Sequence, residues 1–351
     1  MEIHQFLPYL RRGDAAGNHT IALRRWLLQH GPSEIFVEQA DPGVRAMTRH
    51  YTEFEPGNGR VALYHAAIGS RMARELARGP APMVIDYHNV TPARLLAPYD
   101  VRATALALSG SIEIGNLAHR AQLAIGHSAF STRELDDMGF SKTATLPVLI
   151  DLSEYERDPD ARLQSRLSSS KVGTDLLFVG RVSPHKRQED VIKSFYAYKK
   201  FYDPGARLFL VGGGSSDLYN TTLKKFIEEL KVEDVHLTGP VSTPALISYL
   251  SIADVLVSMS EHEGFCVPLL EAMKFNIPII AYASTAVPET LGGAGLLIEE
   301  KNYNEIAALI DLVMRDRNLR DRLVKAGAER LRELDPNIHG ARYLELITDA
   351  A

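Results

Sequence analysis

A glycine turn between two carboxylates is the most informative stretch of this sequence. Residues 260–273 read S-E-H-E-G-F-C-V-P-L-L-E-A-M and follow an apolar run that ends at Ser258. Pro268 suits the first position of a helix, where the N–H has no intrahelical partner. The turn before it would present backbone N–H groups and the positive end of a helix dipole to a phosphate or sugar. Its four residues are Gly264, Phe265, Cys266 and Val267.

The two carboxylates of this segment are placed to share one ligand. Glu263 lies in the loop and Glu271 is expected in the first helical turn, so both can accept hydrogen bonds from sugar hydroxyls. Gly264 permits close approach of the ligand. The alternative is structural: Glu271 complements the helix N-terminus and Glu263 is a surface carboxylate. The preceding strand, the Gly-Phe pair and the proline favour the ligand-binding interpretation.

A second motif offers positive charge. Residues 176–187 read L-L-F-V-G-R-V-S-P-H-K-R, in which an apolar strand ends at Gly180. Arg181 and Lys186 follow in the loop before a predicted helix. Arginine binds a diphosphate bidentately and lysine binds it as a point charge, so the pair suits a diphosphate leaving group. Ordinary surface charge is the alternative.

The first predicted strand is also followed by small residues. In R-G-D-A-A-G-N, residues 12–18, Gly13 and Gly17 allow the chain to pass close to a ligand. The spacing differs from the dinucleotide fingerprint, although Glu38 ends the next strand where a ribose-binding acid would lie. A nicotinamide enzyme therefore stays an alternative. A plain strand-to-helix turn with Asn18 as N-cap is about equally favoured.

A histidine closes another apolar strand of the first half. His88 follows Met83–Tyr87, where its imidazole can hydrogen-bond a reacting sugar, or it is an ordinary satisfied polar residue. No metal site is indicated. The D-P-D triplet at 158–160 lies in a polar segment, and the sequence lacks H-E-x-x-H, a P-loop and G-x-S-x-G.

Alternating strand and helix patterns position these motifs in two series. The pattern predicts an α/β protein with two doubly wound parallel sheets, joined by the polar segment 151–174. In the first half, the expected strands are Ile3–Leu7, Glu34–Val37, Met83–Tyr87, Leu123–Gly126 and Leu146–Ile150. The expected helices there are Asn18–Gln29, Arg60–Arg78, Arg94–Leu106 and Ser131–Met138.

The second series predicts a sheet of its own. Its expected strands are Leu176–Val179, Arg207–Val211, Val235–Leu237, Val255–Ser258, Ile279–Tyr282 and Gly295–Ile298. Its expected helices are Gln188–Phe201, Leu218–Leu230, Thr243–Leu250, Pro268–Phe275 and Asn304–Arg315. Ligands of such sheets bind beyond the carboxyl ends of the strands, which is where both charged motifs fall.

Composition narrows the class of protein. The 351 residues carry a net charge of −5, which gives no electrostatic reason for nucleic acid binding. A single cysteine, no membrane-spanning apolar run and no signal-peptide pattern make a cytoplasmic protein the expectation. Four arginines of the predicted helix 60–78 are favoured as a solvated face, with weak contact to anionic lipid at the inner face of a membrane as the alternative. They are Arg60, Arg71, Arg74 and Arg78.

With these motifs in order, the sequence resembles the family-four, or group 1, retaining glycosyltransferases of the GT-B fold. That family carries G-R-x(4)-K and, later, E-G-F-G-x-P-x-x-E-A-M in its second domain. The likeness is specific from Leu176 to Gly295 and looser before. Cys266 stands where the family usually has glycine, which puts the sugar preference in question more than activity.

The resemblance assigns roles to the motif residues. It implies that Glu263 contacts the donor sugar, Glu271 holds the ribose hydroxyls, and Arg181 and Lys186 bind the donor diphosphate. The glycine-rich loop of the family matches Gly13 to Gly17, and its active-site histidine matches His88. The turn Gly264–Val267, together with Gly180, would complete the donor site.

The resemblance also implies domains and a reaction. Residues 1–155 form an acceptor-side domain, 156–335 bind the nucleotide sugar, and 336–351 form a helix that crosses back to the first domain. The expected activity moves a sugar, with retention and without metal or cofactor, from a nucleoside diphosphate to a glycan or lipid-linked hydroxyl in polysaccharide biosynthesis. GDP-mannose is the first candidate donor and a UDP-sugar the second. A nucleotide-sugar epimerase, a nicotinamide oxidoreductase and a non-catalytic binding protein remain alternatives.

Overall fold

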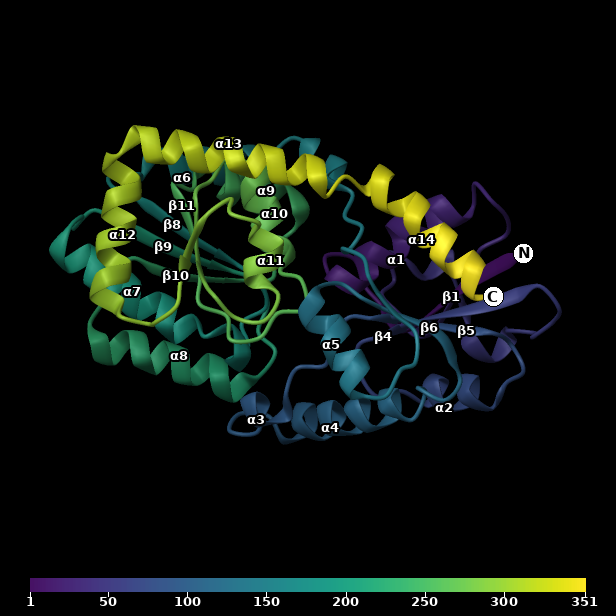
Figure 1. Cartoon of the computed structure of the whole chain (residues 1–351). Coiled ribbons are helices and arrows are strands. Elements are labelled where there is room, and N and C mark those ends of the chain that lie inside the picture. Colours follow the sequence, from purple (N-terminus) through teal and green to yellow (C-terminus); the bar gives the residue numbers. More distant parts are fainter. The chain divides into compact units, whose positions relative to one another are not determined.

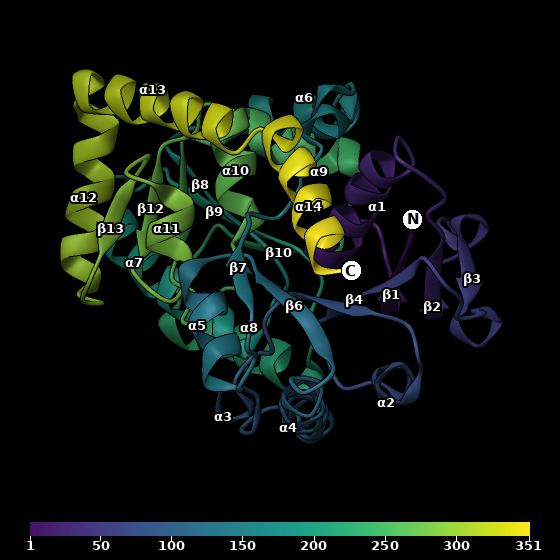
Figure 2. The same ribbon diagram turned by 45° about the vertical axis from the view of Figure 1, so that its right-hand side comes forward.

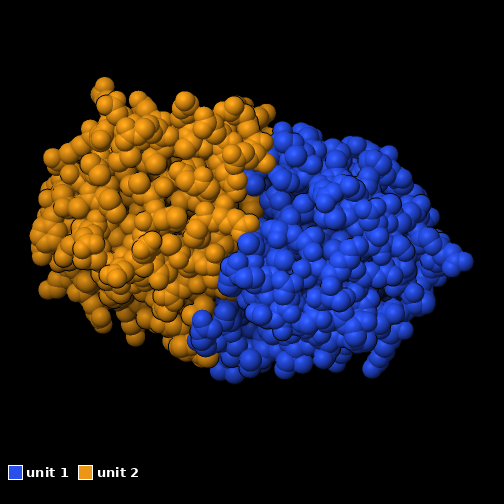
Figure 3. Space-filling view, viewed as in Figure 1, with its two compact units in different colours: residues 1–94, 101–151, 334–351 blue, residues 95–100, 152–333 orange.

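The computed structural model describes all 351 residues, and the chain divides into two compact units (Figure 3). Unit 1 comprises residues 1–94, 101–151 and 334–351; unit 2 comprises residues 95–100 and 152–333. Each unit contains one fully parallel sheet with helices packed on it (Figures 1 and 2). The prediction of two doubly wound α/β domains is therefore confirmed.

Unit 1 has a seven-stranded sheet in the order β3-β2-β1-β4-β5-β6-β7. Its strands are β1 (Glu2–Leu10), β2 (Ile35–Ala40), β3 (Thr48–His50), β4 (Arg60–Ala66), β5 (Met83–Tyr87), β6 (Ala121–Gly126) and β7 (Thr143–Thr145). Its helices are α1 (Ala15–Leu27), α2 (Arg71–Arg78), α4 (Val101–Gly115), α5 (Ala129–Asp137) and α14 (Pro336–Ala350), with short 3₁₀ turns at Arg45–Met47 and Tyr51–Glu53. The short helix α3 (Ala93–Leu96) has its first two residues in unit 1 and its last two in unit 2.

Unit 2 has a six-stranded sheet in the order β10-β9-β8-β11-β12-β13. Its strands are β8 (Asp175–Val179), β9 (Arg207–Val211), β10 (Val235–Gly239), β11 (Val255–Ser258), β12 (Ile279–Tyr282) and β13 (Leu296–Ile298). Its helices are α6 (Ala161–Ser169), α7 (Gln188–Phe201), α8 (Asp217–Leu230), α9 (Thr243–Ile252), α10 (Val267–Lys274), α11 (Val287–Leu291), α12 (Tyr303–Arg315) and α13 (Arg317–Glu333), with 3₁₀ turns at Leu152–Glu156 and Pro184–Lys186.

Alternate side chains of the unit 2 strands pack into two separate hydrophobic cores, one on each face of the sheet. In β8, Leu176 and Phe178 join the cluster formed with α7, α8 and α12. Leu177, between them, joins the cluster formed with α6, α9, α10 and α11. Because both faces of the sheet are covered, its strands are continuously apolar, as the sequence showed.

Two sequence predictions of secondary structure are wrong in unit 1. Residues 60–66 form the central strand β4 rather than the start of a helix, and only Arg71–Arg78 is helical. The run V-A-L-Y-H-A is buried on both faces, so it lacks the alternation that distinguishes a strand from a helix. Leu146–Ile150 is not a strand; β7 lies just before it, at Thr143–Thr145.

The polar segment 151–174 is not a free linker. Most of it belongs to unit 2, where α6 packs on α9 and Leu167 is buried. Asp160 caps α6 by accepting a hydrogen bond from the Leu163 N–H, so the D-P-D triplet serves the helix start. Leu163 and Leu167, one turn apart, form a short apolar stripe, which is difficult to recognise in a segment of such polar composition.

Two adjacent glycines after β9 differ in the space that is available for a side chain. Gly212 has φ +146°, and a Cβ there would lie 2.0 Å from the carbonyl oxygen of Gly180, at the end of β8. A Cβ on Gly213 would only touch the Pro240 ring, at 3.5 Å. Glycine at 212 is therefore required for the two strand ends to meet.

We expect Gly212→Ala to lower the free energy of unfolding by about 1–3 kcal/mol, because the backbone must shift and the residue is strained. Chemical denaturation measures this, with Gly213→Ala as the matched control, expected to stay near wild type. Equal stability of the two variants would contradict the close approach of the β8 and β9 ends.

Candidate functional site

The two charged motifs meet at the topological switch point of the unit 2 sheet. From β8 the chain runs outward through β9 and β10, then returns to β11 on the opposite side of β8. Ligands of open α/β sheets bind at the carboxyl ends of such a pair of strands. The loop after β8 and the loop after β11 touch there, since the Glu261 N–H donates to the His185 carbonyl at 2.8 Å.

An ion pair joins the motifs directly. Lys186 Nζ lies 2.5 Å from Glu263 Oε2, and Glu263 is only 7% exposed. Arg181, at the start of the loop that carries Lys186, is exposed and makes no ion pair or side-chain hydrogen bond. A partly exposed lysine, paired with a buried carboxylate and followed by a solvent-facing arginine on the same loop, can take up an anion.

Glu271 is the most unusual carboxylate of the site. It lies on α10, one turn deeper than expected, and is buried. The Tyr155 hydroxyl donates a hydrogen bond to its Oε1, whereas Oε2 has no partner. Burial raises the pKa of Glu271, against the opposing effect of the Tyr155 hydrogen bond. The sequence gives no signal for Tyr155, because this residue lies in the polar segment 151–174, which is expected to join the two domains.

The N-terminus of α10 carries no side-chain cap. Its N-cap residue is Cys266, held at φ +72°, a region that glycine adopts freely and cysteine seldom does. Burial, followed by the nearby negative charge of Glu263, raises the pKa of the Cys266 thiol. The thiol is therefore protonated and is no nucleophile. The Thr290 hydroxyl fixes the turn by donating to the Phe265 carbonyl.

Thr285 anchors the backbone of Glu263 from the loop after β12. The Glu263 N–H donates to Thr285 Oγ1 at 2.8 Å, and that hydroxyl donates to the Glu263 carbonyl at 2.9 Å. Thr285 has φ +46°, which is rare for a β-branched residue. Such strain is concentrated at functional sites. The sequence marked this loop as a turn without showing which side chain it served.

A further set of charges holds the acidic loop against α7. Glu261 pairs with Arg187 at 2.6 Å and with Lys301 at 3.0 Å. Lys301 also reaches Asp190 on α7, at 2.8 Å. Although burial opposes the shift, these hydrogen bonds lower the pKa of Glu261. This network fixes the loop after β11 without engaging the Lys186 and Glu263 side chains, which stay available to a ligand.

In unit 1, the glycine loop after β1 is shaped by its own backbone. Gly13 has φ +76°, and a Cβ on Gly17 would lie 2.0 Å from the Arg11 carbonyl oxygen. The N-cap of α1 is Asp14, which accepts from the Ala16 N–H, so the prediction of Asn18 as N-cap is wrong. Asn18 lies inside the helix and instead accepts from the Gly13 N–H.

His88 follows β5, as expected, and its side chain is 4% exposed. Its Nε2 lies 3.0 Å from His65 Nδ1 and therefore faces another imidazole. Burial, followed by the nearby His127, lowers the pKa of His88 well below the usual range. A contact between His88 and a sugar stays a prediction.

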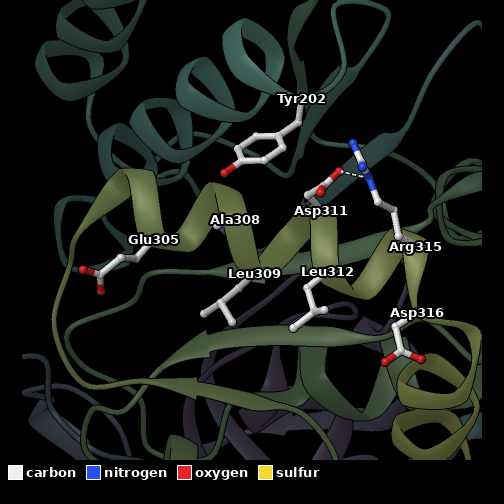
Figure 4. Close-up of a pocket in the computed structure, with 8 residues that line it drawn as sticks. All are labelled: Tyr202, Glu305, Ala308, Leu309, Asp311, Leu312, Arg315 and Asp316. Carbon is white, nitrogen blue, oxygen red and sulfur yellow. Dashed lines mark hydrogen bonds and ion pairs between the residues drawn. The ribbon is translucent and has the colours of Figure 1, made fainter.

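A surface hollow of unit 2 lies away from these residues. It has a volume of about 750 Å³ and lies between Tyr202, just after α7, and one flank of α12 (Figure 4). Asp311 and Arg315 on its rim pair with each other, one turn apart. It contains none of the residues predicted to bind a ligand.

Two parallel-sheet domains, with cations and carboxylates at the switch point of the second, are the arrangement expected of the GT-B fold. Residues 164–330 match the model of the family described as "Glycosyl transferases group 1". This part of the chain is therefore similar to that family, and the expected fold is confirmed.

Named relatives and solved structures agree with this assignment. A Mycobacterium tuberculosis GDP-mannose-dependent alpha-(1-6)-phosphatidylinositol monomannoside mannosyltransferase is 30% identical over 52% of this chain and 49% of its own. The enzyme of the same name from Mycolicibacterium smegmatis is 26% identical over 94% and 90%. The Anabaena protein Alr3699/HepE, solved in complex with UDP and glucose, superimposes with TM-score 0.75 at 17% identity, covering 99% and 100%. The first of these alignments spans about half the length of the relative.

Proposed function

We propose that this protein is a retaining glycosyltransferase that uses a nucleoside diphosphate sugar and needs no metal at the diphosphate. The observation that carries the proposal is Glu271: a buried carboxylate whose Oε2 has no partner, beside the Lys186–Glu263 ion pair. An unpartnered buried acceptor is costly unless a ligand supplies donors. The hydroxyls of a nucleotide ribose are such donors.

Each group of the site has a part in the proposed reaction. Arg181 and Lys186 bind the two phosphates, with the uncapped N-terminus of α10 adding positive potential. The glycosidic bond to the phosphate breaks while the acceptor oxygen bonds to the same face of the sugar carbon, and the acceptor's proton passes to the leaving phosphate. Glu263, ion-paired with Lys186, accepts from sugar hydroxyls. This same-face step needs no covalent nucleophile, and the protonated Cys266 thiol does not provide one.

The nicotinamide alternative loses the residue on which it rested. The Glu38 carboxylate accepts a hydrogen bond at 2.9 Å from the Met72 N–H, in the first turn of α2. The carboxylate thereby satisfies a backbone N–H at the start of α2.

The epimerase alternative is distinguished by assay, because an epimerase would release a new nucleotide sugar rather than free nucleoside diphosphate.

The experiment is a thermal-shift and turnover screen against GDP-, UDP- and dTDP-sugars. GDP-mannose is the first candidate, because it is the donor named for the mycobacterial relatives. A true donor at 100 times its dissociation constant stabilises the protein by about 2.7 kcal/mol. Stabilisation by one donor series, together with release of its diphosphate when an acceptor is added, is the expected result. No stabilisation by any donor would overturn the proposal.

We expect nucleotide affinity to fall at acid pH. Ribose hydroxyls donate to the ionised Glu271, so protonation of this carboxylate competes with nucleotide binding. Because burial raises the pKa of Glu271, the loss of affinity should begin at a higher pH than for an ordinary glutamate. Calorimetric titration of GDP or UDP across pH measures it. Glu271→Gln should bind about 10-fold or more weakly with a flat profile over that range, and Tyr155→Phe should move the midpoint to higher pH.

The control for this titration is Glu229→Gln, on the exposed side of α8. It should bind with the wild-type profile. A midpoint that stays unchanged in Glu271→Gln would assign the acid loss to another group.

For the acceptor, we propose a glycan or lipid-linked hydroxyl presented at the cytoplasmic face of a membrane. The mycobacterial relatives are named for a phosphatidylinositol mannoside acceptor. Arg71, Arg74 and Arg78 are exposed on α2 and give a basic flank suited to anionic lipid. No helix of this chain is long and apolar enough to cross a bilayer.

A further inference from the structure

Unit 1 buries a cluster of four imidazoles around one carboxylate, and only one of them, His88, was expected to contact a sugar. Asp86, on β5, is 0% exposed. His19 on α1, His65 on β4, His88 after β5 and His127 after β6 surround it, and each has a nearly inaccessible side chain. His65 and Asp86 are register partners on neighbouring strands. A charge buried this deeply must be compensated by partners.

The protons of His19 are fixed by its neighbours. The Leu149 N–H donates to His19 Nδ1 at 2.8 Å, so the ring proton is on Nε2. That Nε2–H donates to Asp86 Oδ2 at 2.8 Å. His19 therefore supplies one donor to the carboxylate and has no free lone pair at the centre of the cluster.

His65 has the same tautomer as His19, but it turns its unprotonated nitrogen toward the carboxylate. Gln5 Oε1 lies 2.9 Å from His65 Nε2 and can only accept, so Nε2 carries the proton and Nδ1 a lone pair. That lone pair faces Asp86 Oδ2 at 2.9 Å and His88 Nε2 at 3.0 Å. A lone pair and a carboxylate oxygen at this distance repel unless a positive centre lies between them.

A second acceptor also faces the carboxylate. The Leu146 carbonyl accepts from His127 Nδ1 at 3.2 Å, which leaves the lone pair on Nε2. This atom lies 3.3 Å from Asp86 Oδ1, and neither has a hydrogen-bond partner. The cluster thus holds more acceptors than protons. Desolvation disfavours imidazolium ions, so a bound cation is the better compensation.

We propose that His65 Nδ1, Asp86 Oδ2 and His88 Nε2 bind a divalent transition metal ion of the zinc class. The three atoms lie 2.9, 3.0 and 3.7 Å apart. Ligand atoms that each lie about 2.0–2.1 Å from a tetrahedral zinc ion are about 3.3 Å apart. Two imidazoles and one carboxylate favour zinc or its neighbours over calcium or magnesium, and they leave a fourth position for water.

The surrounding residues complete the coordination environment. A metal-bound histidine donates its other ring proton to a fixed acceptor, as His65 does to Gln5. The coordinating carboxylate is in turn hydrogen-bonded, as Asp86 is by His19. The ion would hold β4, β5 and the start of the loop after β5 together and turn His88 Nε2 inward. All of these residues lie in unit 1, so the inference does not depend on the donor site of unit 2.

The test uses the full chain purified without a polyhistidine tag, loaded with Zn²⁺ and desalted. Elemental analysis should find about one zinc per chain, and Co²⁺ in its place should give the visible absorption of a tetrahedral site. Chelation should lower the melting temperature. Asp86→Asn and His88→Asn should lose the ion, whereas the surface control His30→Ala should keep it.

Two results would overturn the proposal: folded wild-type protein that retains no zinc, or equal retention by wild type, Asp86→Asn and His88→Asn. Should Asp86→Asn fail to fold, the His88→Asn comparison and the wild-type Co²⁺ spectrum still decide. The melting-temperature shift with GDP, measured on metal-free protein, reports the unit 2 site separately.

Discussion

Replacing Lys186 by alanine should reduce turnover by about 10²–10³-fold, the usual cost of removing one group that stabilises charge in the transition state. Lys186 is the cation that the structure brings to the acidic loop, 2.5 Å from Glu263, at the switch point between β8 and β11. Negative charge on the diphosphate grows as the glycosidic bond breaks. Removal of the Lys186 ammonium should therefore reduce turnover more than it weakens donor binding in the ground state. Release of nucleoside diphosphate at saturating donor measures the effect.

Stability must be separated from chemistry in this variant. Loss of Lys186 leaves Glu263, 7% exposed, without its cation, which destabilises the fold. Lys186→Ala combined with Glu263→Gln removes the unpaired charge and should recover melting temperature but not turnover. Lys200→Ala, on the exposed end of α7, is the control and should be as active as wild type. Near-wild-type turnover of Lys186→Ala would contradict the assigned role.

Replacing Arg207 by methionine should give the largest loss of stability. Arg207 begins β9 and pairs through two nitrogens with Asp175, which begins β8 and is 0% exposed. It also donates to Ser170 at 2.6 Å and to the Leu167 carbonyl at 3.0 Å, which fixes the end of α6. Removing one partner of a buried pair costs about 3–5 kcal/mol. Lys171, 3.4 Å from Asp175, compensates in part, so the lower end is expected.

Thermal and chemical denaturation measure this loss. In a domain of this size each kcal/mol shifts the melting temperature by about 2–4 °C. Arg315→Ala is the matched control, because Arg315 pairs with Asp311 within one helix and its side chain is 72% exposed. It should change stability by at most about 0.5 kcal/mol. Equal melting temperatures for the two variants would show that the buried pair contributes nothing.

The unit 2 site was largely predictable, because its residues lie in two short segments that each follow an apolar strand. Gly180, Lys186 and Glu263 could be placed from residue type and strand ends alone. The close contact of the two loops could not, since it depends on β8 and β11 being neighbours although 75 residues of chain separate their ends. Thr285 was missed for the same reason, as it reaches Glu263 from a third strand end.

Errors in unit 1 came from features that local patterns do not encode. The strand β4 has no two-residue period, because both of its faces are buried. The imidazole cluster depends on the register that sets His65 beside Asp86 across two strands, and on α1 bringing His19. Cys266 is a third case, since nothing in its neighbours shows that cysteine must adopt a backbone conformation typical of glycine.

The most direct test of the account is the crystal structure of the chain with GDP or UDP bound, whichever raises its melting temperature. Both phosphates should lie within hydrogen-bond distance of Arg181, Lys186 and the N–H groups that begin α10, with a ribose hydroxyl on Glu271 Oε2. A nucleotide bound in the hollow beside α12, or at the glycine loop after β1, would contradict the assignment.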